Sequence, residues 1–145
     1  MTLVVLYLSA IEIIKICFPE SSLESRIGPA LFPPALLALS SPFWGNSLIA
    51  EVYTLHSFFT VLIIYLLLLW KNNNDSRFLF LAALCFGLSA GNHGTVAFYL
   101  PAVLVLFLVW EKKNKVKNLG ITTLFFLIGF SVYLYLPIRS MAEPI

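Results

Sequence analysis

Long apolar runs alternate with short polar breaks along most of this chain. The runs occupy residues 2–18, 28–39, 48–70, 78–110 and 119–136, and the fourth is interrupted by Gly-Asn-His-Gly at residues 91–94. A membrane core about 30 Å thick takes about 20 helical residues to cross, and residues 48–70 and 119–136 match that length best. Residues 28–39 are short and contain Pro29, Pro33 and Pro34, which predicts a helix that is kinked or that has Pro29 as its first residue.

Composition points to a lipid environment for these runs. Hydrophobic residues make up 60% of the 145 residues and charged residues 11%, which leaves too little polar surface to cover a soluble core. The net charge of +2 gives no argument for nucleic acid as a partner. Cys17 and Cys85 lie in apolar runs without metal-ligand spacing, so they are read as packing residues and no metal site is expected. The expected fold class is an all-α, polytopic transmembrane helical bundle.

Basic residues give this bundle a predicted orientation. Lysines and arginines gather in the breaks at residues 71–77 and 111–118, and the positive-inside rule places these two loops in the cytoplasm. Alternation of the spans then puts the break at residues 19–27, which contains Arg26, on the same side. Trp70 and Trp110 each end an apolar run next to such a loop, as interfacial aromatic residues do. The motif Ser-Pro-Phe-Trp at residues 41–44 is then predicted to be a turn at the outer interface.

The interrupted run must enter the membrane and return, because both of its ends are cytoplasmic. Residues 78–90 rise only about 20 Å as a helix, so the break at residues 91–94 falls short of the outer surface or barely reaches it. Irregular backbone at such a depth is tolerated where it lines a cavity or is covered by protein. We therefore predict a helical hairpin, residues 78–90 and 95–110, and a polar cavity open to the outer face with Asn92 and His93 at its floor or wall.

Two ionisable residues near the outer face are candidates for chemistry. Glu51 lies about one turn inside an apolar run, where a carboxylate is costly and is a functional candidate by default; its alternative is to complement the positive end of a helix. His93 is suited to carry a proton or to bind phosphate or sugar, and its alternative is a neutral histidine hydrogen-bonded in a glycine-flanked turn. Gly87 and Gly91 are spaced for close helix packing more than for cradling phosphate.

Arg139 and His56 complete the set of polar candidates. Arg139 stands at the outer end of the last apolar run, against the charge bias, and a guanidinium fork matches two phosphate oxygens. Its alternative is an interfacial arginine that reaches lipid headgroups. His56 follows Glu51 by five residues and so lies on a different helical face; we interpret it as a packing or interhelical hydrogen-bonding residue.

Four motifs in order, SPFW, EVYTL, GLSAGNH and YLPIRS, resemble the membrane family of transmembrane protein 260-like protein O-mannosyltransferases. The resemblance runs from about Ser40 onward. It implies a GT-C type glycosyltransferase that moves a sugar, mannose above all, from a polyprenyl- or dolichyl-phosphate donor to a protein hydroxyl on the extracytoplasmic face. It implies Glu51 as an assisting or orienting catalytic residue, and Tyr53, Asn92, His93 and Arg139 as residues that bind the substrate or donor.

The resemblance also bears on completeness and location. Family members carry an upstream span and an acidic outer loop that supply the base, and the chain begins inside an apolar run. The 145 residues are therefore expected to be a middle portion of the enzyme and to be inactive alone. The implied location is the bacterial inner membrane or the endoplasmic reticulum membrane, as a multi-pass protein. No cofactor motif is present, and the need for a divalent metal is left open.

Two other classes of protein are compatible with the residues alone. A transporter or channel module also uses a broken hairpin with an intramembrane acid. A non-catalytic scaffold would need only the packing surface around Gly87 and Gly91.

Overall fold

The computed structural model describes residues 1–48, 53–111 and 114–142, with the backbone alone at Leu136. All regular elements in these ranges are helices, which confirms the all-α class for the described part of the chain. They are α1 (Thr2–Cys17), α2 (Leu23–Ala30), α3 (Phe32–Ala38), α4 (Ser41–Leu48), α5 (Tyr53–Asn73), α6 (Ser76–Asn92), η1 (Gly94–Tyr99), α7 (Leu100–Trp110), α8 (Lys115–Phe130), η2 (Ser131–Leu134) and α9 (Tyr135–Ala142).

The region of residues 28–39 differs from the single helix, kinked or beginning at Pro29, that its prolines predict, and Pro29 lies inside α2. Two short helices, α2 and α3, meet at Leu31, and α2 begins several residues earlier, where the Ser22 side chain accepts a hydrogen bond from the Ser25 amide. Pro33 and Pro34 lack amide hydrogens and would clash with carbonyls four residues back, so α2 cannot continue through them. They are instead accommodated in the first turn of α3, where an amide hydrogen is not needed.

The predicted turn at residues 41–44 is wrong, because these residues form the first turn of α4. Pro42 fits there for the same reason as Pro33, since the first turn of a helix has no internal partner for its amide hydrogens. The Trp44 indole donates a hydrogen bond to the carbonyl of Ala38, which ties α4 back to the end of α3.

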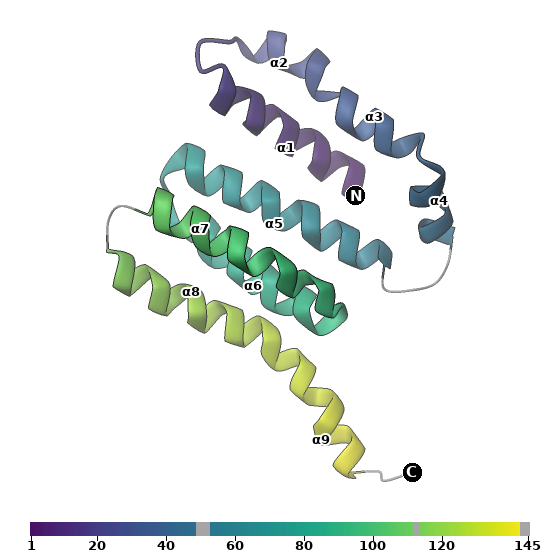
Figure 1. Ribbon diagram of the computed structural model, residues 1–145, viewed down its shortest axis with the longest axis vertical. Helices are drawn as coiled ribbons and strands as arrows, with labels where there is room; N and C mark the ends of the chain where they lie inside the picture. The colour runs from purple at the N-terminus through teal and green to yellow at the C-terminus, as the bar shows by residue number, and fades with distance from the viewer. Residues whose placement is uncertain (49–52, 112–113, 143–145) are drawn as a thin grey trace.

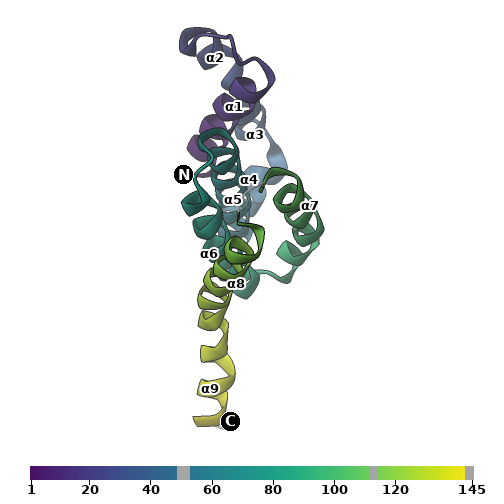
Figure 2. The same cartoon turned by 90° about the vertical axis from the view of Figure 1, so that its left-hand side faces the viewer.

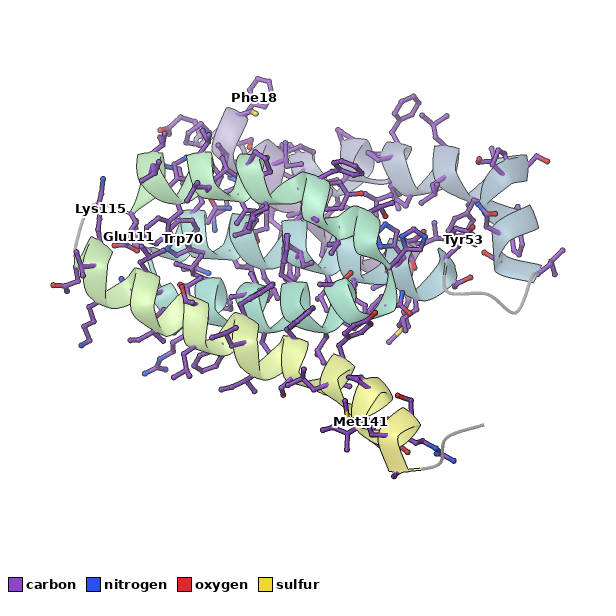
Figure 3. All side chains as sticks on the ribbon, turned by 60° about the horizontal axis from the view of Figure 1, so that its bottom comes forward. Phe18, Tyr53, Trp70, Glu111, Lys115 and Met141 are labelled. Atoms are coloured by element: carbon purple, nitrogen blue, oxygen red, sulfur yellow. The ribbon has the colours of Figure 1, made fainter. Side chains whose placement is uncertain are left out.

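The helices form a thin layer with α7 to one side. α1, α5, α6 and α8 lie in a row, with α2 and α3 beyond α1 (Figure 1), and the view along the layer shows α7 standing off its face (Figure 2). The row has two distinct ends. We call the end that carries Lys71, Arg77, Lys115 and Lys117 the basic end; the other, where α5 begins at Tyr53, is the histidine end (Figure 3).

The closest helix contact is between α6 and α8, and two glycines make it possible. A Cβ atom on Gly87 would collide with the Phe126 carbonyl and would lie 2.7 Å from the Phe130 amide nitrogen. A Cβ atom on Gly129 would collide in turn with the Leu84 carbonyl and would lie 3.2 Å from the Cα of Gly87. Gly87 therefore serves close helix packing, as its spacing predicts, and not a phosphate cradle.

An apolar core fills the space between α5, α6 and α7. Leu79 and Val96 are almost fully buried, and Trp70 stacks on Phe107 with ring centroids 6.4 Å apart. Between these contacts α7 leaves a cavity of about 220 Å³ whose lining is nearly all apolar. The cavity extends along α7 from Leu100 to Phe107 and is lined on the other side by α5, α6 and α8.

Two helices are long and apolar enough to cross a membrane: Tyr53–Asn73 and the continuous run Lys115–Ala142. The hairpin arms Ser76–Asn92 and Gly94–Trp110 are apolar but shorter. α6 ends inside the predicted break, so the hairpin turns where its sequence indicates.

Candidate functional site

The turn of the hairpin is organised by His93. The residue leaves helical geometry with φ −152° and ψ 120°, while its amide still donates to the Ser89 carbonyl at 2.9 Å, so it ends α6. Its Nδ1 atom accepts from the Thr95 amide at 3.4 Å and thereby caps η1. One residue thus ends α6 with its backbone amide and caps η1 with its side chain, which fixes the imidazole at the histidine end of the layer.

The Thr95 hydroxyl links two histidines from different helices. Its Oγ1 atom lies 2.7 Å from Nδ1 of His93 and 3.3 Å from Nε2 of His56, which comes from the second turn of α5. The imidazole rings of His56 and His93 are 5.0 Å apart between centroids. The interhelical hydrogen bond predicted for His56 is therefore present, and its partner is the residue beyond the hairpin turn.

Tyrosine rings flank the two histidines. Tyr53, at the start of α5, lies 5.6 Å from His93 between ring centroids, and Tyr99, at the end of η1, stacks nearly parallel to His56 at 6.4 Å. The exposed fraction is 41% for Tyr53 and 39% for Tyr99, so both residues are accessible at the surface of the cluster. We call Tyr53, His56, His93, Thr95 and Tyr99 the histidine cluster.

The histidine cluster offers hydrogen bonding and proton exchange. An imidazole is both donor and acceptor when neutral, and a threonine hydroxyl adapts to either neighbour. Nδ1 of His56 is buried and has no hydrogen-bond partner among the described residues, so the atoms of the cluster that can meet a ligand belong to its more exposed members. Hydroxyl-rich ligands suit such a surface, because each hydroxyl can donate and accept and the aromatic faces cover apolar C–H groups.

A metal centre has no support in the described residues. They contain no group of three or more histidine, cysteine, aspartate or glutamate side chains placed to hold a metal ion. His56 and His93 alone fall short of the three protein ligands of a catalytic zinc site.

The predicted site residues fall in different places. Tyr53 and His93 lie together in the histidine cluster, and Asn92 precedes it as the partly buried last residue of α6. Glu51 lies outside the described residues. Arg139 is exposed on α9, where Nη1 donates to the Tyr135 hydroxyl at 2.8 Å. The structure does not bring Arg139 to the cluster, because α9 leads away from the ends of α5 and α6 (Figure 1).

The polar cavity predicted at Asn92 and His93 stays a prediction, and a different, partly polar pocket lies beside the start of α5. A pocket of about 230 Å³ lies on the side of α5 that faces α3 and α4, and neither Asn92 nor His93 contributes to its lining. Its polar lining includes Ser40 and Thr54, whose hydroxyl donates to the Asn46 carbonyl at 3.2 Å. This pocket adjoins the start of α5, close in sequence to Glu51.

Two members of the cluster, Thr95 and Tyr99, are absent from the residues selected by sequence, and His56 is present there only in a packing or interhelical hydrogen-bonding role. The signal for His56 is its spacing: three residues after Tyr53, it shares that residue's helical face. Glu51 and His56 lie on different helical faces, so the spacing between these two residues does not indicate that His56 and Tyr53 share a face. Nothing in the local sequence distinguishes Thr95, because its role depends on a fold that brings α5 beside the hairpin turn.

Comparison with known proteins gives one family. The family described as protein O-mannosyl-transferase TMEM260 N-terminal domain matches residues 1–117, which include the hairpin and the histidine cluster. The match reaches further towards the N-terminus than the motif SPFW and ends before YLPIRS. No curated protein and no solved structure gives a significant match. The chain belongs to the family of the protein O-mannosyl-transferase TMEM260 N-terminal domain.

Proposed function

We propose that the full-length protein is a multi-pass GT-C type glycosyltransferase that transfers a mannosyl group from a polyprenyl- or dolichyl-phosphate donor to a protein hydroxyl on the extracytoplasmic face. Family membership supports the reaction class. The observation that carries the proposal for this chain is the histidine cluster, a set of polar and aromatic side chains at the end of the layer opposite the basic end. By the positive-inside rule, that end faces away from the cytoplasm.

The reaction exchanges one bond for another at the sugar's anomeric carbon. A base takes the proton of the acceptor hydroxyl as its oxygen bonds to the anomeric carbon, and the bond from that carbon to the phosphate oxygen breaks. The bonding pair leaves with the lipid phosphate, whose charge needs stabilisation. His93 supplies a hydrogen bond that orients a sugar or acceptor hydroxyl, His56 holds the Thr95 hydroxyl in place, and Tyr53 and Tyr99 provide faces for the sugar ring.

Two residues outside the cluster have proposed roles that rest on sequence. Glu51 precedes Tyr53 by two residues and would assist or orient the acceptor at the start of α5. Arg139 would bind the donor phosphate if α9 packs closer to the cluster in the full-length enzyme, since its guanidinium is bonded only to a neighbouring tyrosine among the described residues.

The apolar cavity beside α7 is a suitable place for the donor's isoprenoid tail. Leu100 lines the cavity and directly follows Tyr99 of the histidine cluster, so a donor whose sugar rests on the cluster has an apolar channel within reach of its tail. Burial of a hydrocarbon chain there would fill space that is otherwise without packing contacts.

The test is sugar transfer by the full-length protein in membranes. Incubation with radiolabelled polyprenyl-phosphate mannose should label an acceptor protein, and His93→Ala, Glu51→Gln and Arg139→Ala should each abolish labelling at unchanged expression. Lys115→Gln at the basic end is the matched control and should retain activity. If the protein transfers no polyprenyl-phosphate sugar but takes up a solute, it is a transporter and the proposed enzyme activity is wrong. Wild-type turnover in a variant would remove that residue from the site.

A further inference from the structure

A second polar site lies at the basic end, in a groove between the first turns of α6 and α8. The groove has a volume of about 530 Å³ and is open to the surface. α6 contributes Arg77 to one wall and α8 contributes Lys117 to the other. Because α6 and α8 are parallel neighbours held together at Gly87 and Gly129, these two cations are kept on opposite sides of one opening.

Both cations are available to a ligand. Arg77 and Lys117 are exposed, and neither terminal group makes a hydrogen bond or an ion pair with another residue in the described part of the chain. The groove also contains the carboxylate of Asp75, which accepts a hydrogen bond from the Arg77 amide at 3.0 Å as the cap of α6. Two positive charges and one engaged negative charge leave the opening net positive.

The groove changes character with depth. Near its mouth the Asn118 amide donates to the Ser76 hydroxyl at 3.1 Å and joins α6 to α8. One turn further into the layer the walls are Phe80 and Ile121. A ligand that fills this groove therefore meets cations first, polar groups next and hydrocarbon last.

We propose that this groove binds the phosphodiester headgroup of an anionic membrane phospholipid. The Arg77 guanidinium matches two phosphate oxygens and the Lys117 ammonium adds a point charge from the opposite wall. Phe80 and Ile121 continue as a path for the lipid's acyl chains, which inorganic phosphate would leave unused. Basic pockets between membrane helices bind anionic headgroups in this manner. The site is independent of the histidine cluster at the other end of the layer.

Native mass spectrometry of the full chain in detergent micelles tests this site. With equal amounts of phosphatidylglycerol and phosphatidylcholine, the wild-type protein should retain phosphatidylglycerol selectively. Arg77→Gln combined with Lys117→Gln should weaken its retention about 25-fold, from about 1 kcal/mol for each cation near an anionic surface. Arg77→Lys combined with Lys117→Arg keeps both charges and should keep binding, which excludes misfolding as the cause of the loss.

Lys115→Gln is the matched control, because it removes the same charge two residues from Lys117 but outside the groove lining. Its lipid retention should equal that of the wild type. If Lys115→Gln and Lys117→Gln lose phosphatidylglycerol retention equally, general surface charge explains the binding and the proposed site is wrong. Displacement of phosphatidylglycerol by millimolar inorganic phosphate would overturn the lipid assignment in favour of a free phosphate.

Discussion

His56 of α5 lies beside His93 of the hairpin turn, with ring centroids 5.0 Å apart, and the Thr95 hydroxyl links the two side chains. The two imidazoles come from different helices, so the contact fixes the start of α5 against the end of α6. It also concentrates polar atoms at the end of a layer whose middle is almost wholly apolar. The relation between these residues is the basis of the proposed site.

Removal of the Thr95 hydroxyl, which links the two histidines, should lower sugar transfer. Thr95→Val keeps the shape of the side chain but removes both hydrogen bonds, each worth about 1 kcal/mol to stability. We expect sugar transfer by the full-length enzyme to fall about tenfold or more, since 1.4 kcal/mol corresponds to a factor of ten. Thr95→Ser retains the hydroxyl and should retain most activity. Equal activity of Thr95→Val and the wild type would show that the histidines need no link.

The glycine contact between α6 and α8 should be intolerant of a methyl group. Gly87→Ala places Cβ against the Phe126 carbonyl, which belongs to backbone and cannot rotate away. Such overpacking costs about 1 to 3 kcal/mol, so thermal unfolding in detergent should occur at a lower temperature. Gly120→Ala is the control, because no atom lies within 4 Å of its added Cβ. The packing account fails if the two variants unfold at the same temperature.

Asn72 joins α5 to α1 at the basic end. Its side-chain amide donates to the Glu12 carboxylate and to the Glu12 carbonyl, the latter at 3.3 Å. Asn72→Ala should loosen α1 by about 1 to 3 kcal/mol, because it leaves a partly buried carboxylate short of a donor. Limited proteolysis between α1 and α2 measures this loosening. Asn73→Ala, at the exposed neighbouring position, should leave the cleavage rate unchanged; accelerated cleavage in both variants would discount the link.

Topology has a built-in reporter in the sequon Asn74-Asp75-Ser76. Asn74 lies at the basic end, so it should stay unglycosylated when the protein is expressed in a eukaryotic host. A cysteine reporter checks the opposite end: with Cys17 and Cys85 replaced by serine, Gly45→Cys should react with a membrane-impermeant maleimide added outside, and Asn74→Cys should not. A glycan at Asn74 would show that the orientation in the membrane is the reverse of the predicted one.

The hairpin shows what sequence can predict in this protein. The polar break at residues 91–94 interrupts an apolar run, and the helix ends inside it because glycine and asparagine favour turns and His93 caps the next helix. Charge bias likewise separates a basic end from a polar end. These features depend on residues close together in the chain, where local pattern is informative.

The residues that form the histidine cluster are harder to predict from sequence. Thr95 and Tyr99 join the cluster only because α5 packs beside the hairpin, and such a contact between distant residues leaves no local pattern. SPFW is typical of an interfacial turn with aromatic anchors, yet its serine and proline also begin helices. Arg139 matched the chemistry of a phosphate ligand, but chemistry alone did not indicate the direction in which α9 leaves the layer (Figure 1).

Photo-crosslinking of the donor tests the proposed site most directly. A polyprenyl-phosphate mannose analogue with a photoreactive group on the sugar, irradiated with the full-length protein in membranes, should label peptides that contain Tyr53 and His56 or His93 and Tyr99. Unlabelled donor should compete, and His93→Ala should reduce the labelling. Labelling confined to other segments, with the same intensity in His93→Ala, would contradict the assignment of sugar binding to the histidine cluster.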